Sequence, residues 1–96
     1  MSGPARYPAA VSHTVILSSA RTPFGRLGGA LSSRTAVQLG VVAASAAFQR
    51  AGVEPSDIDY AVIGHVVQAG AGHIPSRQVT LAAGVPDEIG SDTVNK

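Results

Sequence analysis

Cysteine is absent from this sequence of 96 residues. The chain therefore has no disulfide framework, no thiolate that could bind a metal and no thiol that could act as a nucleophile. This absence is compatible with a cytoplasmic protein. Tryptophan is also absent, and aromatic residues make up only 4% of the chain. Because aromatic side chains bury the most area per residue, a domain formed by this chain alone would have a thin core.

Charge and long apolar runs are sparse as well. Lys and Arg are scattered and the net charge is +1, which argues against a nucleic-acid-binding surface. No apolar run approaches the length of a transmembrane helix, and the start, "MSGPARYPAAVSH", lacks the apolar core of a secretory signal. We therefore expect neither nucleic acid nor membrane as a partner. Residues 1–12 are predicted to be a flexible leader or a cloning remnant, although Arg6 without an acidic neighbour also fits a transit peptide.

The sequence also lacks the motifs that bind nucleotides or metals. The loops "GRLGGA" and "GAGHIP" fail the G-x-G-x-x-G spacing, and neither contains the end of a P-loop. Their glycines are better explained by tight turns and close packing. The three histidines have no H-x-x-x-H spacing, so no metal site is predicted. Acidic residues beside Pro55 are suited to capping a helix rather than to acid–base chemistry. From the residues alone, no catalytic constellation is complete.

Apolar segments of two kinds alternate along the chain. Strands are predicted where β-branched and apolar residues run consecutively, and helices where capping residues and Pro or Gly mark both ends. Thr35 with Gln38 forms a capping box, Pro55 and Pro75 suit the first turn of short helices, and Gly52 ends the long helix. The predicted order is a strand at 14–17, a helix from 35 to 52, a strand at 60–66, a helix at 75–83 and a strand at 91–95.

This order predicts an α/β fold. Strands separated by helices pair in parallel through crossover connections. The long helix is apolar almost all round, and we expect it to be largely buried, with Gly40 allowing another backbone close. Parallel strands buried on both faces need helices on both sides, and two helices cover too little. Residues 13–96 therefore indicate the first half of a doubly wound, mainly parallel sheet domain that is incomplete in this chain.

Four stretches in this order resemble the amino-terminal portion of thiolases. They are "VILSSARTPFGRLGGAL", "LGVVAASAAFQRAGVEPSDIDYAVIGHV", "VQAGAGHIPSRQVTLAAGVP" and "TVNK". The signature A-R-T-P-x-G corresponds to Ala20–Gly25, and Q-A-G-x-G-x-x-P-x-R-Q corresponds to Gln68–Gln78. The resemblance covers residues 13–96, and it implies the β-α-β-α-β beginning of the thiolase fold.

The resemblance implies acyl transfer between two acyl-CoA thioesters, with carbon–carbon bond formation or thiolytic cleavage. In that family a nucleophilic cysteine follows the N-K dipeptide almost at once, at the start of a buried helix. A helix N-terminus favours a thiolate and can help to hold an oxyanion. The family's histidines, second cysteine and CoA-binding loop come later than Lys96. The resemblance therefore places no catalytic, cofactor-binding or metal-binding residue on this chain, and coenzyme A thioesters are substrates of the complete enzyme.

The second signature also implies an interface. Its segment resembles the one that packs between thiolase subunits near their active sites, and the implied interface residues are Gln68, His73, Arg77 and Gln78. Relatives commonly have Q-N-P where this chain has His73, Ile74 and Pro75, which weakens any specific polar contact there. Arg21 and Thr22 match A-R-T-P and are assigned to loop structure or to an interface.

The first hypothesis is therefore an amino-terminal fragment of an oligomeric, cytoplasmic acyltransferase of fatty acid metabolism. Its partners would be the remainder of the polypeptide, acyl-CoA and further copies in a homodimer or homotetramer. We expect the chain alone to be inactive, since the nucleophile would lie past Lys96. Two alternatives remain: a non-catalytic interaction or assembly module on a thiolase-like scaffold, and a nucleotide-binding α/β domain. Nucleotide affinity in the glycine loops would favour the last.

Overall fold

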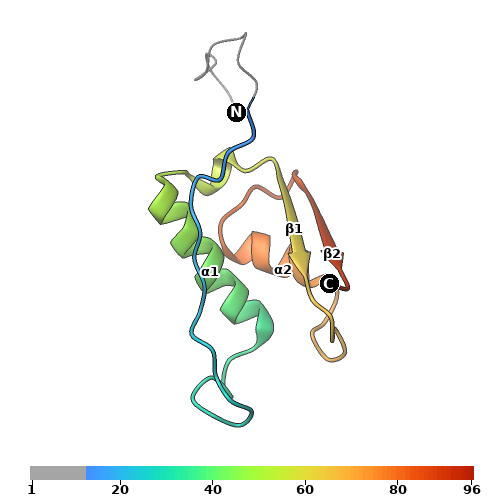
Figure 1. Ribbon diagram of the computed structural model, residues 1–96. Helices are drawn as coiled ribbons and strands as arrows, with labels where there is room; N and C mark the ends of the chain where they lie inside the picture. Colours follow the sequence, from blue (N-terminus) through green and yellow to red (C-terminus); the bar gives the residue numbers. More distant parts are fainter. Residues whose placement is uncertain (1–12) are drawn as a thin grey trace.

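Residues 13–96 are described in the computed structural model, so the leader predicted at residues 1–12 lies outside the described residues (Figure 1). The described residues form two α-helices, one turn of 3₁₀ helix and two strands. Along the chain these are α1 (Ala36–Ala51), η1 (Pro55–Asp57), β1 (Tyr60–Gly64), α2 (Pro75–Ala82) and β2 (Gly90–Val94). The predicted helices and the last two predicted strands are therefore present, with ends that differ by one or two residues.

The two strands form a parallel ladder, as the sequence predicted. Tyr60 pairs with Gly90 and Gly64 pairs with Val94, and the backbone N–H of His65 adds a further bond to the Val94 carbonyl at 2.8 Å. The connection between the strands contains α2, which packs against both of them, while α1 packs against α2 (Figure 1). The layers are therefore sheet, then α2, then α1.

Among residues 13–96, elements pack on only one face of this sheet. In β1 the half-buried residues alternate with exposed ones, and Tyr60 and Val62 on the open face are 53% and 61% exposed. Side chains on alternate positions of a strand point to opposite faces, so α2 covers the face of Ala61 and Ile63. A parallel sheet normally has both faces buried. The structure is thus an open α/β piece, as the sequence predicted.

Helix α1 begins and ends as its capping residues predict. The Thr35 hydroxyl accepts from the Gln38 N–H at 3.1 Å, and the Gln38 side chain accepts from the Thr35 N–H at 2.9 Å. Gly52 ends the helix with a left-handed φ of 68°. Where α1 meets α2, a Cβ on Gly40 would lie 3.0 Å from Val79 Cγ2. The missing side chain at this position lets the two helices approach closely.

The expectation that α1 is largely buried is wrong for this chain. None of its residues is fully buried, and Val42 is 59% exposed. Covering an apolar helix on all sides requires neighbours around its whole circumference. Among the described residues, α2 and the extended segment at 14–19 provide cover on parts of α1 only.

The predicted first strand at Thr14–Leu17 also differs from the structure. The segment has no ladder partner among the described residues and runs along α1 (Figure 1). Ser18 Oγ donates to the Ala47 carbonyl at 2.7 Å, and Arg50 Nη1 donates to the Ser19 carbonyl at 2.9 Å. Ile16 is 91% exposed. Its β-branched residues give the segment an extended preference, but a strand also needs an adjacent strand to bond.

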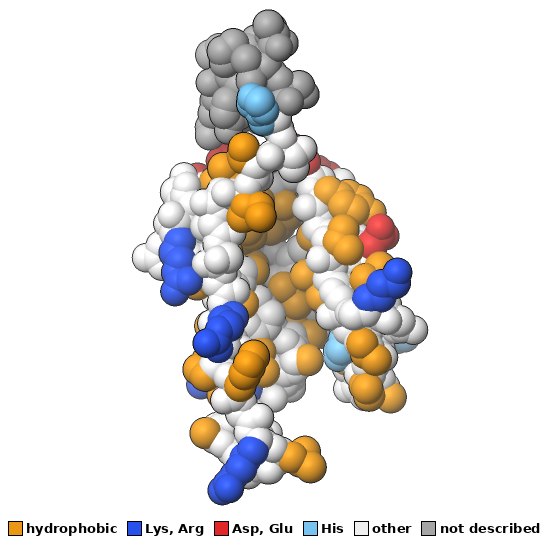
Figure 2. All heavy atoms as spheres, in the orientation of Figure 1, with side chains coloured by type: hydrophobic (Ala, Val, Ile, Leu, Met, Phe, Trp, Pro, Cys, Tyr) orange, Lys and Arg blue, Asp and Glu red, His pale blue; other side chains and the backbone are white. Residues whose placement is uncertain are grey.

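The fully buried residues are few and cluster on α2. They are Ser76, Val79 and Thr80, together with Pro75 and the nearby Val85. Ser76 has no exposed surface; its N–H donates to Thr93 Oγ1 at 3.0 Å and its hydroxyl lies 3.2 Å from Ser91 Oγ. These bonds join the start of α2 to β2. Figure 2 shows hydrophobic side chains inside the hollow between the helical side of the molecule and the sheet, so the core is incompletely filled.

On the open face, Tyr60 bonds to the neighbouring strand. Its hydroxyl donates to Asp92 Oδ2 at 2.5 Å. This hydrogen bond raises the pKa of Tyr60 above its ordinary value of 10.0, and partial desolvation and the Asp92 charge act in the same direction. The phenol is therefore held in its neutral, donating form.

We expect Thr35→Ala to lower the free energy of unfolding by about 1 kcal/mol, because the change leaves an N–H at the start of α1 without its side-chain acceptor. Equilibrium denaturation of the complete protein, with and without the substitution, measures the difference. Ser at the same position keeps the hydroxyl and should retain most of the stability. A Thr35→Ala protein as stable as the original would show that the capping box contributes nothing.

We also expect Asp92→Asn to lower the pKa of Tyr60 toward its ordinary value, since the charge that opposes tyrosinate formation is removed. Because the pKa of Tyr60 is higher in the folded protein than in the unfolded one, the contact stabilises the folded protein below pH 10. This stabilisation is lost as the pH rises through the folded-state pKa. Absorbance titration of tyrosinate measures the shift, with Tyr60→Phe identifying the signal. An unchanged titration in Asp92→Asn would contradict the contact.

Candidate functional site

The loop between β1 and α2 lies where the two parallel strands end. Gly64 and Val94 are the last residues of β1 and β2 and pair with each other, so the loop and the segment after β2 leave the same edge of the sheet. In open α/β sheets, ligands bind outside the carboxyl ends of the strands. The predicted interface segment, Gln68–Gln78, begins in this loop and ends in α2.

Gln68 joins this loop to the end of β2. Its Nε2 donates to the His65 carbonyl at 2.9 Å and to Asn95 Oδ1 at 2.7 Å. One side chain thus fixes the start of the loop and the residue that follows β2. The sequence placed Gln68 at an interface but did not predict its contact with Asn95.

Gln78 closes the other side of the same loop. From the first turns of α2 its Nε2 donates to the Ala71 carbonyl at 2.8 Å and the His73 carbonyl at 2.9 Å. Gly72 lies against this amide with a left-handed φ of 83°, and a Cβ there would lie 3.0 Å from Gln78 Nε2. The Gln78 amide therefore gives the loop its shape, and it brings Gln78 and the backbone of His73 together.

Ile74 has an unusual backbone conformation just before α2. Its φ of 48° lies in the left-handed region, where a β-branched residue is strained. Its carbonyl accepts from the N–H groups of Arg77 and Gln78 at 2.9 and 3.2 Å. These bonds hold the strained residue at the start of α2, and its side chain is 59% exposed.

Arg77 points away from the loop. Its Nη1 donates to the Ile89 carbonyl at 3.2 Å and its Nη2 donates to the Asp87 carbonyl. The guanidinium therefore ties α2 to the segment before β2, a contact within the chain. His73 is exposed on the loop. Of the four predicted interface residues, the structure brings His73 and Gln78 together, whereas Gln68 and Arg77 hold two different ends of β2.

A cavity of about 350 Å³ separates this loop from the start of α1. Its walls are small apolar side chains, loop backbone and a few polar groups, and they include Thr35, Val37, His65, Ala71 and Gln78. These groups can bind and orient a ligand, and none of them is a thiol. Among residues 13–96, no group of three or more His, Asp or Glu is placed to hold a metal ion, and no helix there is long and apolar enough to cross a membrane.

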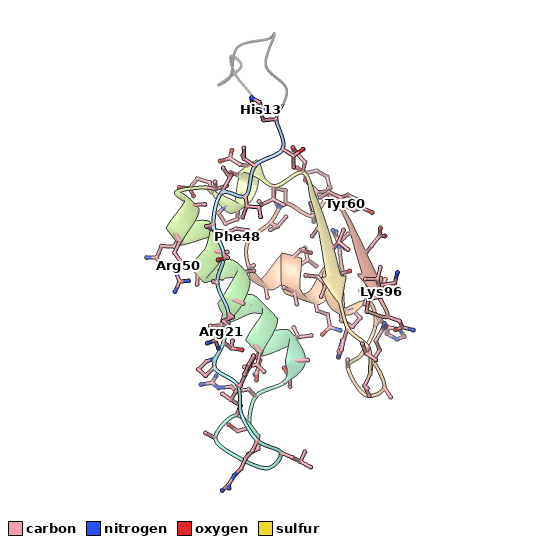
Figure 3. The ribbon with its side chains drawn as sticks, in the orientation of Figure 1. His13, Arg21, Phe48, Arg50, Tyr60 and Lys96 are labelled. Carbon is pink, nitrogen blue, oxygen red and sulfur yellow. The ribbon has the colours of Figure 1, made fainter. Side chains whose placement is uncertain are left out.

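Gly64 is a residue of this site that lies outside both sequence signatures. A Cβ built on it would overlap the carbonyl group of Lys96, whose carbon would lie 3.3 Å away. Glycine inside a strand often marks the close approach of another backbone, and this signal was present in the apolar run "YAVIGHV". The carbonyl group of Lys96 thus lies against β1 at Gly64, and Figure 3 shows Lys96 at this end of the sheet.

Comparisons with known proteins agree with this geometry. The family model described as "Thiolase, N-terminal domain" matches residues 14–96. The chain is 52% identical over 81 residues to a cytosolic acetyl-CoA acetyltransferase of Gibberella zeae, which covers 84% of this chain and 20% of that protein. It is 41% identical over 86 residues to an acetyl-CoA acetyltransferase of Cupriavidus necator, covering 90% and 22%.

Solved structures show the same relationship. An acetyl-CoA acetyltransferase from Syntrophomonas wolfei matches with a TM-score of 0.80 and 43% identity, over 83% of this chain and 20% of that one. The Acat5 thiolase from Ascaris suum, solved in complex with coenzyme A, matches with a TM-score of 0.82 and 36% identity, over 84% and 21%. This chain spans about a fifth of the length of these relatives. The chain belongs to the thiolase family, and residues 14–96 match the model of its amino-terminal domain.

Proposed function

We propose that the protein to which this chain belongs transfers acyl groups between acyl-CoA thioesters, forming a carbon–carbon bond or cleaving one by thiolysis. Relatives over most of the chain are named acetyl-CoA acetyltransferases, and a structural neighbour was solved with coenzyme A. Coenzyme A thioesters are the substrates of the complete enzyme in this proposal.

The observation that carries the proposal is the path of the chain at the end of β2. Asn95 and Lys96 leave the sheet at its carboxyl edge, and Gln68 and Gly64 contact them there. The 96 residues contain no cysteine. We place the nucleophilic cysteine shortly after Lys96, at the beginning of a helix whose N-terminus would favour the thiolate.

The chemistry of the complete enzyme then takes two steps. The cysteine thiolate attacks the thioester carbonyl of the first acyl-CoA; a carbon–sulfur bond forms to the enzyme, and the bond to coenzyme A breaks, releasing its thiolate to be protonated. Next a base of the complete enzyme takes a proton from the α-carbon of a second acetyl-CoA, and the resulting carbanion attacks the acyl-cysteine. A carbon–carbon bond forms, and the cysteine leaves as thiolate. Thiolysis is the reverse. The 96-residue chain alone is inactive in this proposal, because it lacks the nucleophile.

The role of the chain is therefore to provide scaffold and contact surface. We assign the segment Gln68–Gln78 to the interface between subunits of a homodimer or homotetramer. The exposed side chains of His73 and Ile74 are available to a second subunit, whereas the Gln68 and Gln78 amides shape the segment from within. The remainder of the polypeptide is the other partner and supplies cover for the open sheet face. A cytoplasmic location is supported by the cytosolic relative from Gibberella zeae.

The first acyl transfer can be trapped directly. We expect the complete protein, incubated with acetyl-CoA and quenched in acid, to carry one acetyl group per chain. Peptide mapping should place the acetyl group on the first cysteine after Lys96. Substitution of that cysteine by serine should abolish both the modification and the thiolysis of acetoacetyl-CoA.

The chain of residues 1–96, treated in the same way, is the matched control and should remain unmodified. A complete protein that binds its partners but takes up no acetyl group would contradict the proposed acyltransferase activity. That result would favour the alternative of a non-catalytic assembly module on a thiolase scaffold.

A further inference from the structure

The last residue pair of the β1–β2 ladder, Gly64 with Val94, has an unusual steric requirement at Gly64. Its φ is not in the left-handed region, so its backbone torsion does not demand glycine. Glycine is required because another segment of the same chain lies close. Any Cβ at Gly64 would overlap the Lys96 carbonyl oxygen and approach the Lys96 carbonyl carbon to 3.3 Å. Real Cβ atoms do not occupy such positions, so a side chain here must displace the backbone of Lys96.

Two hydrogen bonds hold the residues just before Lys96. The His65 N–H donates to the Val94 carbonyl at 2.8 Å, and Gln68 Nε2 donates to Asn95 Oδ1 at 2.7 Å. The last residue of β2 and the two residues after it, Val94–Lys96, therefore each contact a residue at the end of β1 or the start of its loop. These contacts all come from one short segment, residues 64–68.

This path also has a direction. Gly64 shares a face of β1 with Tyr60 and Val62, because alternate residues of a strand point to the same side. That face is the open one, opposite α2, and both side chains there are more than half exposed. The Lys96 carbonyl, which lies where a Gly64 side chain would stand, is therefore on the open face of the sheet.

We propose that Gly64 and Gln68 are positioning residues for the nucleophile. They act through Asn95 and Lys96 by fixing where the following residues begin, and so where the nucleophile stands relative to the bound thioester. This inference rests on the proposed function, which places the nucleophilic cysteine shortly after Lys96. A displacement of about 1 Å at a reacting centre can reduce the rate by about 100-fold.

The test compares Gly64→Ala with Gly90→Ala in the complete protein. Gly90 is a matched control because it lies in the same ladder at the opposite end, and its added Cβ would press on the Tyr60 ring, 2.6 Å from Cε1. Gly64→Ala should lower kcat for acetoacetyl-CoA thiolysis by about 100-fold with little change in KM, since binding of the thioester is retained. Gly90→Ala should retain kcat.

The rate at which iodoacetamide alkylates the cysteine is a second measurement, which distinguishes a displaced nucleophile from a general loss of structure. A displaced nucleophile that still stands at its helix N-terminus should react with this small reagent at nearly the original rate, although its kcat has fallen. A general loss of structure would instead change alkylation and kcat together. The combination of low kcat and retained alkylation therefore identifies positioning.

A second pair of variants applies if Gly64→Ala does not fold. Gln68→Leu keeps the size of the side chain but removes the bonds to His65 and Asn95, and it should lower kcat with little change in KM. Gln49→Leu, on the exposed side of α1, is its control and should leave kcat unchanged.

The outcomes separate the two proposals. A complete protein that forms no acetyl-cysteine would overturn the proposed function and this inference with it. An active protein in which Gly64→Ala behaves as Gly90→Ala, or in which Gln68→Leu behaves as Gln49→Leu, would overturn the positioning role alone.

Discussion

The parallel ladder between β1 and β2 is the interaction on which the rest of this structure depends. It makes the connection between the strands a crossover, and that crossover contains α2, whose buried Ser76 bonds to the side chains of β2. It also brings the ends of both strands to one edge, so that the loop after Gly64 and the residues after Val94 can contact each other. The helix α1 depends on α2 in turn, through the close approach at Gly40. The same ladder explains why one face of the sheet is exposed. The α-helices of the described residues both lie on the other face, so the face of Tyr60 and Val62 has no cover among those residues.

Local signals in the sequence predicted most of the helices and two of the strands. The capping box of Thr35 and Gln38, the proline at 75 and the glycine at 52 each act within a few residues, so their effect is readable without the fold. The predicted strand at Thr14–Leu17 failed for the opposite reason. A strand is defined by hydrogen bonds to a neighbour, and propensity shows only that the segment is extended. The predicted burial of α1 failed for a similar reason. An apolar helix surface indicates that packing partners are needed, but it does not show whether this chain contains them.

The candidate site was predictable in part for the same reasons. The signature Gln68–Gln78 identified the segment, and its glycines predicted a loop. The long-range contacts were beyond the sequence: Gln68 bonds to Asn95, 27 residues away, and Arg77 bonds to the carbonyls before β2. The role of Gly64 was visible only as a glycine in an apolar strand, a signal that indicates a close approach without naming what approaches. Membership of the thiolase family was predicted from the motifs and confirmed by comparison.

We propose that these residues form a part of a domain whose sheet is completed by the remainder of the polypeptide. Denaturant unfolding of the isolated chain of residues 1–96 tests it most directly, followed by circular dichroism and by the fluorescence of a dye that binds exposed apolar surface. We expect dye binding in the absence of denaturant and no cooperative unfolding transition, because the buried apolar core is limited to a few side chains around α2. A monomeric isolated chain that binds no dye and unfolds in one cooperative transition would contradict it.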